Sequence, residues 1–280
     1  MSASYVLPDK PLVVIERSAA WASMNFRGLW AYRELFYFLM WRDLKVRYRQ
    51  TVLGATWAIL QPLLTMLIFT YFFGRLVKVP SDGIPYPIFA YAGLVTWSFF
   101  SSAVSLGSNS LLANSGVIAK VYFPRIIIPA ATVSATLVDF GITLVLLAPL
   151  MLYYGYALSW SFVLLPFFIV LTALFALAVG MLISAFAVRY RDALYATPFL
   201  IQIWFFMSPV IYPSSLVPPS HRWLMELNPL TGIIEGFRAV LFGRPLNWSP
   251  VLFSVAFPMV LLIYAAHRFR KAERTFAEFI

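Results

Sequence analysis

Long runs with almost no charged residues alternate with short charged segments along this chain. The runs occupy about residues 52–74, 86–107, 126–152, 162–187, 194–212 and 247–267. A helix of about 20 apolar residues is long enough to cross the hydrocarbon core of a bilayer. The pattern therefore predicts an all-α integral membrane protein with six transmembrane helices, occupying residues 50–268 in all.

The segment before the first run, residues 28–49, has a different pattern. Its apolar residues recur at helical spacing, and a basic cluster made of Arg42, Lys45, Arg47 and Arg49 closes it. This combination is typical of an amphipathic helix lying in the headgroup layer. It serves either as a membrane-surface anchor or as an interface with a partner. Residues 1–27 and 269–280 are expected to be a cytoplasmic arm and a cytoplasmic tail.

The distribution of Lys and Arg orients the six predicted spans. Only five of the 21 Lys and Arg residues fall in segments placed outside, namely Arg75, Lys78, Arg222, Arg238 and Arg244. Basic residues are retained on the cytoplasmic side of membrane proteins. We therefore expect both termini and the connections at residues 109–125 and 189–192 to be cytoplasmic.

Composition narrows the functional classes. Hydrophobic residues make up 61% of the chain and charged residues 11%, far below the charge content of a soluble domain, so the net charge of +10 fits a membrane better than a nucleic acid. There are no cysteines, and the two histidines are far apart. No glycine-rich phosphate loop is present. We expect no catalytic residue, metal or cofactor in this chain.

The long connection between the fifth and sixth spans, residues 213–246, contains its own helical pattern. The segment NPLTGIIEGFRAVLFG, from Asn228 to Gly243, predicts a short amphipathic helix at the outer surface. Such a helix either caps the bundle or covers an exit as an outer gate. The candidate gate residues are Asn228, Pro229, Glu235, Phe237 and Arg238.

Polar residues inside the spans are candidates for a transport pathway. Gln61, Asp139 and Gln202 are each roughly 16 to 21 Å from the basic end of their span, at about 1.5 Å per residue. Polar groups in hydrocarbon need partners or water. Asp139 either forms a hydrogen bond within its own helix or faces a wet pathway.

Two of these residues belong to mixed aromatic and polar stripes. The first predicted span carries Trp57, Gln61, Thr65 and Phe72 on one face, and the fifth carries Tyr195, Phe199, Gln202 and Phe206. The two stripes either face each other and line a conduit, or pack helices together.

Four segments, in order along the chain, resemble one family of membrane proteins. They are DLKVRYRQTVLGATWAILQP (43–62), NSLLANSGVIAKVYFPRIIIP (109–129), RYRD (189–192) and the segment 228–243 described above. They are similar to the permease subunits of export-type ABC transporters, the Wzm-like exporters of O-antigen and other lipid-linked polysaccharides. The resemblance covers about residues 28–270 and leaves residues 1–27 without an assigned role.

This resemblance implies a homodimer in the bacterial inner membrane, with separate ATPase subunits that bind ATP and Mg on the cytoplasmic side. It implies that residues 28–49 and the connection after the second span contact the ATPase. The coupling residues would be Asn114, Ile118, Lys120, Tyr122, Phe123, Pro124 and Arg125. We expect Tyr122 and Phe123 to fill a groove on the ATPase, or else to be interfacial belt residues.

The expected function is export of an O-antigen-like, lipid-linked polysaccharide. Capsule or teichoic-acid polymer is an alternative cargo, and a membrane enzyme or accessory subunit acting on a lipid-linked sugar is an alternative class. The acidic residues are scattered through the sequence, which favours transport over catalysis.

Overall fold

The computed structural model describes residues 30–49, 56–121, 123–157 and 159–273. The predicted arm at residues 1–27, most of the predicted tail and Tyr122 lie outside these residues. The helices follow the hydrophobic pattern of the sequence. They are α2 (Arg33–Tyr48), α3 (Thr56–Phe69) continued by the π-helix η1 (Thr70–Leu76), α4 (Tyr86–Ala113), α5 (Ser115–Ile118), α6 (Ile127–Tyr153), α7 (Leu165–Ala187) preceded by the 3₁₀ helix η2 (Trp160–Leu164), α8 (Asp192–Phe206), η3 (Ser214–Leu216), η4 (Pro219–His221), α9 (Arg222–Glu226), α10 (Pro229–Phe242) and α11 (Trp248–Glu273).

Within the part of the chain that the structure describes, five helical segments are long and apolar enough to cross a membrane: 56–76, 86–113, 127–153, 160–187 and 248–273. They match five of the six predicted spans. The other predicted span, residues 194–212, corresponds to α8, which has only 15 residues and ends at Phe206. Pro209 explains the early end, because proline has no backbone N–H and disfavours helical geometry in the residue before it. The count of six complete spans is therefore not confirmed.

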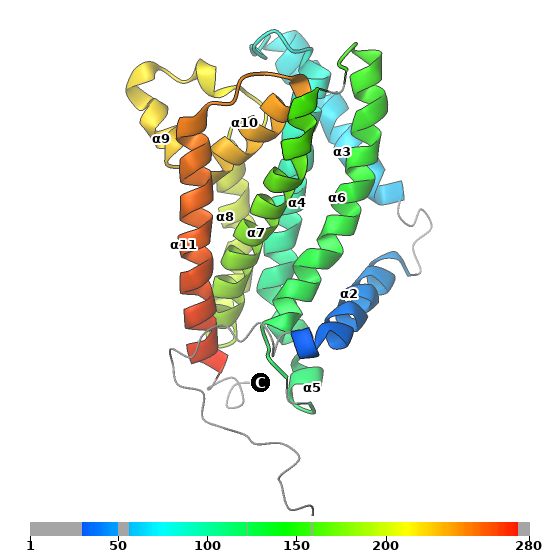
Figure 1. Ribbon diagram of the computed structural model, residues 1–280, viewed down its shortest axis with the longest axis vertical. Coiled ribbons are helices and arrows are strands. Elements are labelled where there is room, and N and C mark those ends of the chain that lie inside the picture. The colour runs from blue at the N-terminus through cyan, green and yellow to red at the C-terminus, as the bar shows by residue number, and fades with distance from the viewer. Residues whose placement is uncertain (1–29, 50–55, 122, 158, 274–280) are drawn as a thin grey trace, which may run out of the picture.

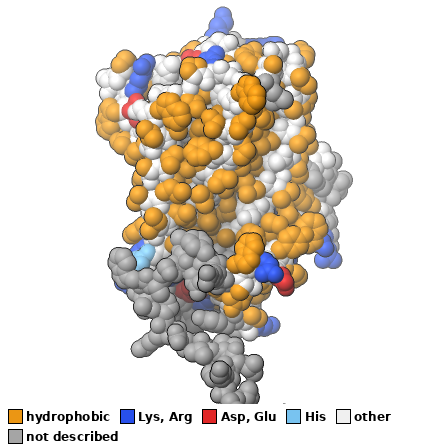
Figure 2. All heavy atoms as spheres, viewed as in Figure 1, with side chains coloured by type: hydrophobic (Ala, Val, Ile, Leu, Met, Phe, Trp, Pro, Cys, Tyr) orange, Lys and Arg blue, Asp and Glu red, His pale blue; other side chains and the backbone are white. Residues whose placement is uncertain are grey.

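The surface of the bundle has the layering of a membrane protein. Figure 2 shows hydrophobic side chains over the middle of one face and charged side chains near its two ends. In Figure 1, α5, the lower part of α2 and the last turns of α11 lie at one end, called here the α5 end, and α9 and α10 lie near the opposite end, the α10 end. Leu39, Ile118 and Phe269 share one hydrophobic cluster at the α5 end. The first and last described helices therefore meet on the same side of the bundle.

Helix α4 lies at the centre of the fold. It packs most extensively against α7 and α6 and also contacts α3, α8 and α10. The crossing with α7 is close because glycines meet there: a Cβ atom added at Gly180 would lie 3.4 Å from the Cα of Gly107. Helix α3 with η1 differs from α4. Only 11% of the residues in the most apolar stretch of 56–76 are buried, against 78% of those in the corresponding stretch of α4. Most of α3 is thus left uncovered by its own subunit.

Helix α10 corrects the prediction of an amphipathic helix on the outer surface. Thirteen of its residues are buried and only Glu235 is partly exposed. It is enclosed by α11, α4 and α7. Two glycines permit this enclosure, because a Cβ at Gly232 would lie 2.3 Å from the Pro250 carbonyl oxygen and one at Gly236 would lie 2.2 Å from the Phe168 ring. The sequence periodicity found a helix, but contact on several sides buried its polar face as well.

Candidate functional site

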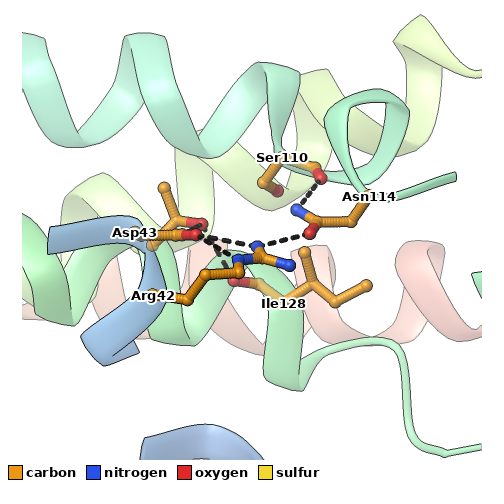
Figure 3. A network of polar contacts seen from close by, with 6 residues as sticks. Arg42, Asp43, Ser110, Asn114 and Ile128 are labelled. Carbon is orange, nitrogen blue, oxygen red and sulfur yellow. Dashed lines mark hydrogen bonds and ion pairs between the residues drawn. The ribbon is translucent and has the colours of Figure 1, made fainter. Parts of the chain in front are cut away.

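The α5 end is tied together by a polar network that starts on α2. Arg42 donates hydrogen bonds to Asp43 at 2.7 Å and to the side-chain oxygen of Asn114, at the end of α4. Asn114 in turn donates to the Ser110 carbonyl, and Asp43 accepts from Thr132 of α6. Figure 3 shows this network between the three helices. Predicted interface and coupling residues, Arg42 and Asn114, are therefore in direct contact.

The predicted coupling segment is partly embedded in the subunit. Ile118 and Phe123 are 7% and 3% exposed and belong to the hydrophobic cluster at the α5 end, whereas Lys120 is exposed. Arg125 donates from its backbone N–H to the Glu273 side chain and from its guanidinium to the Glu273 carbonyl, both at 3.0 Å. Pro124, which lies between Phe123 and Arg125 in the sequence, is partly buried.

This placement corrects one expectation. Phe123 packs the interior of its own subunit, so its side chain is not presented as an aromatic anchor for a groove on another protein. An anchor role is left to Tyr122, which lies outside the described residues.

A second contact joins α2 to the middle of α6. Arg47 forms an ion pair with Asp139, and the Tyr48 hydroxyl donates to the other oxygen of the same carboxylate. Asp139 therefore takes its partners from another helix, not from within its own. Burial lowers the pKa of Arg47 below its usual value, and the nearby Tyr48 and Asp43 offset only part of this effect. Arginine nevertheless keeps its proton at physiological pH.

The two contacts fix the direction of α2. Asp43 contacts Thr132, and Arg47 contacts Asp139, which lies seven residues further along α6. Seven helical residues span about 10 Å, so Asp139 is about 10 Å closer to the α10 end than Thr132. Helix α2 thus leans along α6, as Figure 1 shows. Lys45 and Arg49, the other two predicted basic residues, remain exposed.

A cavity of about 380 Å³ opens beside this ion pair, between α3, α4 and α6. Three members of the predicted first stripe, Trp57, Gln61 and Thr65, lie in its wall, and Phe72 does not. Arg47, Tyr48 and Asp139 also line it. The structure therefore brings residues from the interface helix, from the first stripe and from α6 to one polar cavity.

The second predicted stripe lies elsewhere. Tyr195, Phe199 and Phe206 of α8 are 85%, 64% and 60% exposed, and Gln202 is exposed beside them. None of the four lines the cavity. One subunit does not bring the two stripes together, so a conduit between them stays a prediction about an assembly of subunits.

The sequence analysis missed a polar stripe on α4. Ser98, Ser102, Ser105 and Asn109 follow one another at spacings of four, three and four residues. They form the partly or fully exposed strip of a helix that is otherwise mostly buried. Ser98 and Ser102, with Ser101, reach the cavity, and the stripe continues from there toward the α5 end. Helical spacing of small polar residues in an apolar run was the signal that could have found it.

The outer candidates lie at a hydrogen-bonded junction between α10 and the end of α8. Asn228 begins α10: its side-chain oxygen accepts from the Leu230 N–H and from Trp204 of α8, and its amide donates to the Met207 carbonyl and the Ser208 hydroxyl. Asparagine is a favoured N-cap. Pro229 then fits the first helical turn, where no backbone donor is needed.

Arg238 makes the deepest polar contacts of this junction. It is 5% exposed and donates to the carbonyls of Phe89 at 3.2 Å, Pro209 at 2.6 Å and Val210. Its guanidinium lies 3.6 Å from the centre of the Phe89 ring. The residue thereby joins α10 to α4 and to the turn that ends α8. Glu235 accepts from the Ser214 N–H, and Phe237 is buried in the core.

Long apolar helices with an open cavity lined by polar residues between three of them define a multi-pass helical membrane protein. Within the described residues, no group of three or more His, Asp or Glu side chains is placed to hold a metal. The chain belongs to the ABC-2 type transporter family, whose model matches residues 34–242. It is a transport subunit of that family.

Three relatives illustrate the range of the family. The O-antigen export system permease protein RfbA of Myxococcus xanthus is 33% identical over 91% of this chain and 98% of its own length. A protein of the same name from Klebsiella pneumoniae is 28% identical over 85% of this chain and 92% of its own. The polysialic acid transport protein KpsM of Escherichia coli is 23% identical over 84% and 92%.

Proposed function

We propose that this protein is the permease subunit of an ABC transporter that exports an O-antigen-like, lipid-linked polysaccharide across the bacterial inner membrane. The observation that carries the proposal is the cavity lined by polar residues, with the serine stripe of α4 leading from it, in an otherwise apolar bundle of a chain whose relatives include O-antigen export permeases. Hydroxyl and amide groups without excess charge suit a sugar chain. The higher identity to RfbA than to KpsM favours an O-antigen-like cargo over a capsular one.

Energy for export would come from separate ATPase subunits that bind ATP and Mg. The network of Arg42, Asp43 and Asn114 supports a docking surface at the α5 end. Its hydrogen bonds connect α2 directly to the corner between α4 and α5, so a force on either would be transmitted to the other. Two permease copies would form the functional unit. The poorly covered α3 and the exposed stripe of α8 support this homodimer.

Deleting the gene in its own host tests the function. Lipid-linked polysaccharide of unchanged structure should accumulate on the cytoplasmic face and disappear from the cell surface, and a plasmid copy should restore display. Restoration should fail when the partner ATPase is inactivated. A change in the composition or linkage of the polysaccharide, with normal delivery to the surface, would instead indicate an enzyme or accessory subunit.

The orientation of the subunit has its own test. We expect the α5 end and both termini to be cytoplasmic, because the α5 region and the last turns of α11 are basic and Arg42 of α2 lies against Asn114 beside α5. The chain lacks cysteine, so single-cysteine variants can be labelled cleanly. Ser115→Cys should be protected from an impermeant thiol reagent in intact spheroplasts, and Ser215→Cys at the α10 end should react. The reverse pattern would invert the topology.

A further inference from the structure

The wall of the cavity between α3, α4 and α6 carries accessible hydrogen-bonding groups that have no partner within the described residues. Among the described residues, the amide of Gln61 and the hydroxyls of Ser98 and Ser102 make no hydrogen bond, although all three line the cavity. Within the hydrocarbon layer such groups need a partner or water. The wall therefore offers donors and acceptors that no other part of the described subunit uses.

The other hydroxyls of the wall keep capacity as acceptors. Thr65, Ser101, Thr136 and Thr143 each donate to a main-chain carbonyl three or four residues earlier in their own helix. A hydroxyl that donates in this way still has free lone pairs. The cavity thus presents a mixed set of neutral donors and acceptors from three helices.

The charges of the wall compensate each other. Arg47 and Asp139 are its two charged residues, and they are paired. The pair leaves the wall with no net charge to attract an anionic or a cationic ligand, which favours a neutral one. The aromatic side chains of Trp57, Phe99 and Phe140 complete the wall with apolar surface, against which C–H groups can pack.

We propose that this cavity is a binding site for one neutral, hydroxyl-rich headgroup, namely a sugar unit of the lipid-linked glycan. Its volume of about 380 Å³ lies within the range of small-molecule sites. Helix α2 supplies part of the wall through Arg47 and Tyr48, so the site is built jointly by the interface helix and the bundle. The proposal rests on the proposed function and locates a discrete sugar site within one subunit.

Cysteine protection tests the site in the permease–ATPase complex in nanodiscs. Ser102→Cys places a thiol in the wall, and Asn109→Cys places one on the same stripe of α4, about 10 Å closer to the α5 end and outside the cavity. Each variant is treated with a small methanethiosulfonate. The ligand is a farnesyl phosphate that carries a disaccharide of the host glycan. Farnesyl phosphate alone and phosphatidylglycerol-containing nanodiscs serve as separate arms.

The glycolipid should slow modification of the Ser102→Cys variant about fivefold at four times its dissociation constant and leave the Asn109→Cys variant unchanged. Gln61→Leu should remove this protection because it removes the unpaired amide. Gln202→Leu, the same change on α8 outside the cavity, should preserve it.

The other outcomes decide between occupants. Protection by phosphatidylglycerol alone, equal to that by the glycolipid, would keep a hydroxyl-rich headgroup but assign it to a phospholipid, which overturns the sugar assignment. Equal protection by farnesyl phosphate would overturn hydroxyl recognition. A Ser102→Cys thiol that never reacts, while Asn109→Cys reacts, would mean that a protein segment fills the cavity. Any of these results, together with normal polysaccharide export by cells that carry the unmodified protein, would reject the sugar site and leave the proposed function intact.

Discussion

Two arginines, Arg47 and Arg238, hold helices together in different parts of the bundle and in different ways. Arg47 on α2 is 25% exposed and pairs with a carboxylate that is 23% exposed. Arg238 on α10 is 5% exposed and binds main-chain carbonyls on two other segments. The first contact joins two partly exposed side chains in the wall of an open cavity, and the second joins a buried cation to the backbone.

The difference concerns how easily each contact is released. Water that enters the cavity can replace the partners of this partly exposed pair, so the net contribution of the pair is small. A buried guanidinium and the carbonyls it binds have no such replacement, and separating them leaves unsatisfied groups. The α2 contact therefore suits a part that moves when an ATPase acts, and the α10 junction suits a part that holds its shape.

The largest effect should come from Arg238. Arg238→Met keeps much of the side-chain bulk but leaves the carbonyls of Pro209 and Val210 without their donor. We expect a loss of roughly 3 kcal/mol in unfolding free energy, measured by denaturation in detergent micelles. Arg222→Met, at an exposed arginine of α9, is the control and should change stability little. Equal effects at the two positions would mean that the junction is not the stabilising element.

A smaller effect is expected where α10 approaches α7. Gly236→Ala would place a Cβ 2.2 Å from the Phe168 ring and should cost about 1–3 kcal/mol. Gly141→Ala in α6 is the matched control, since nothing lies within 4 Å of its added Cβ, and it should stabilise the helix by up to about 1 kcal/mol. Thermal denaturation of both variants gives the comparison. A Gly236→Ala variant as stable as wild type would show that α10 packs loosely.

The smallest change in stability should follow loss of the α2 contact. Asp139→Asn removes the ion pair with Arg47 and should cost at most about 1 kcal/mol, while altering ATP hydrolysis by the complex. A double-mutant cycle with Arg47→Gln isolates the pairwise energy. Strong destabilisation by either single change, with unaltered hydrolysis, would make this contact as structural as that of Arg238.

The sequence around α10 is sufficient to predict the helix itself but not its burial. Asn228, Pro229 and Gly243 mark the start and end of the helix: an N-cap, a first-turn proline and a left-handed C-cap with φ of +64°. These are local properties, like the helical spacing of apolar residues from which the sequence predicted the helix. Burial of its polar side depends on Gly232 and Gly236 meeting α11 and α7, which are distant in sequence.

The candidate site divides in the same way. Gln61 and Asp139 could be selected from the sequence because a polar residue in an apolar run is conspicuous. Their surroundings could not be predicted from the sequence. Asp139 pairs with Arg47, which lies 92 residues earlier, and Gln61 lines one cavity together with serines of α4. The spans themselves conceal which face of each helix meets another, since apolar residues occur on all sides.

The sequence by itself determined the class of protein, the positions of five long helices and the basic helix α2, because hydrophobic runs and charge placement act locally along the chain. The tertiary structure decided that α8 and α3 leave their stripes apart, that Phe123 turns inward and that α10 is enclosed. Those outcomes follow from packing between distant segments, where close contacts at glycines, a buried arginine and one ion pair select a single arrangement from many that the hydrophobic pattern allows.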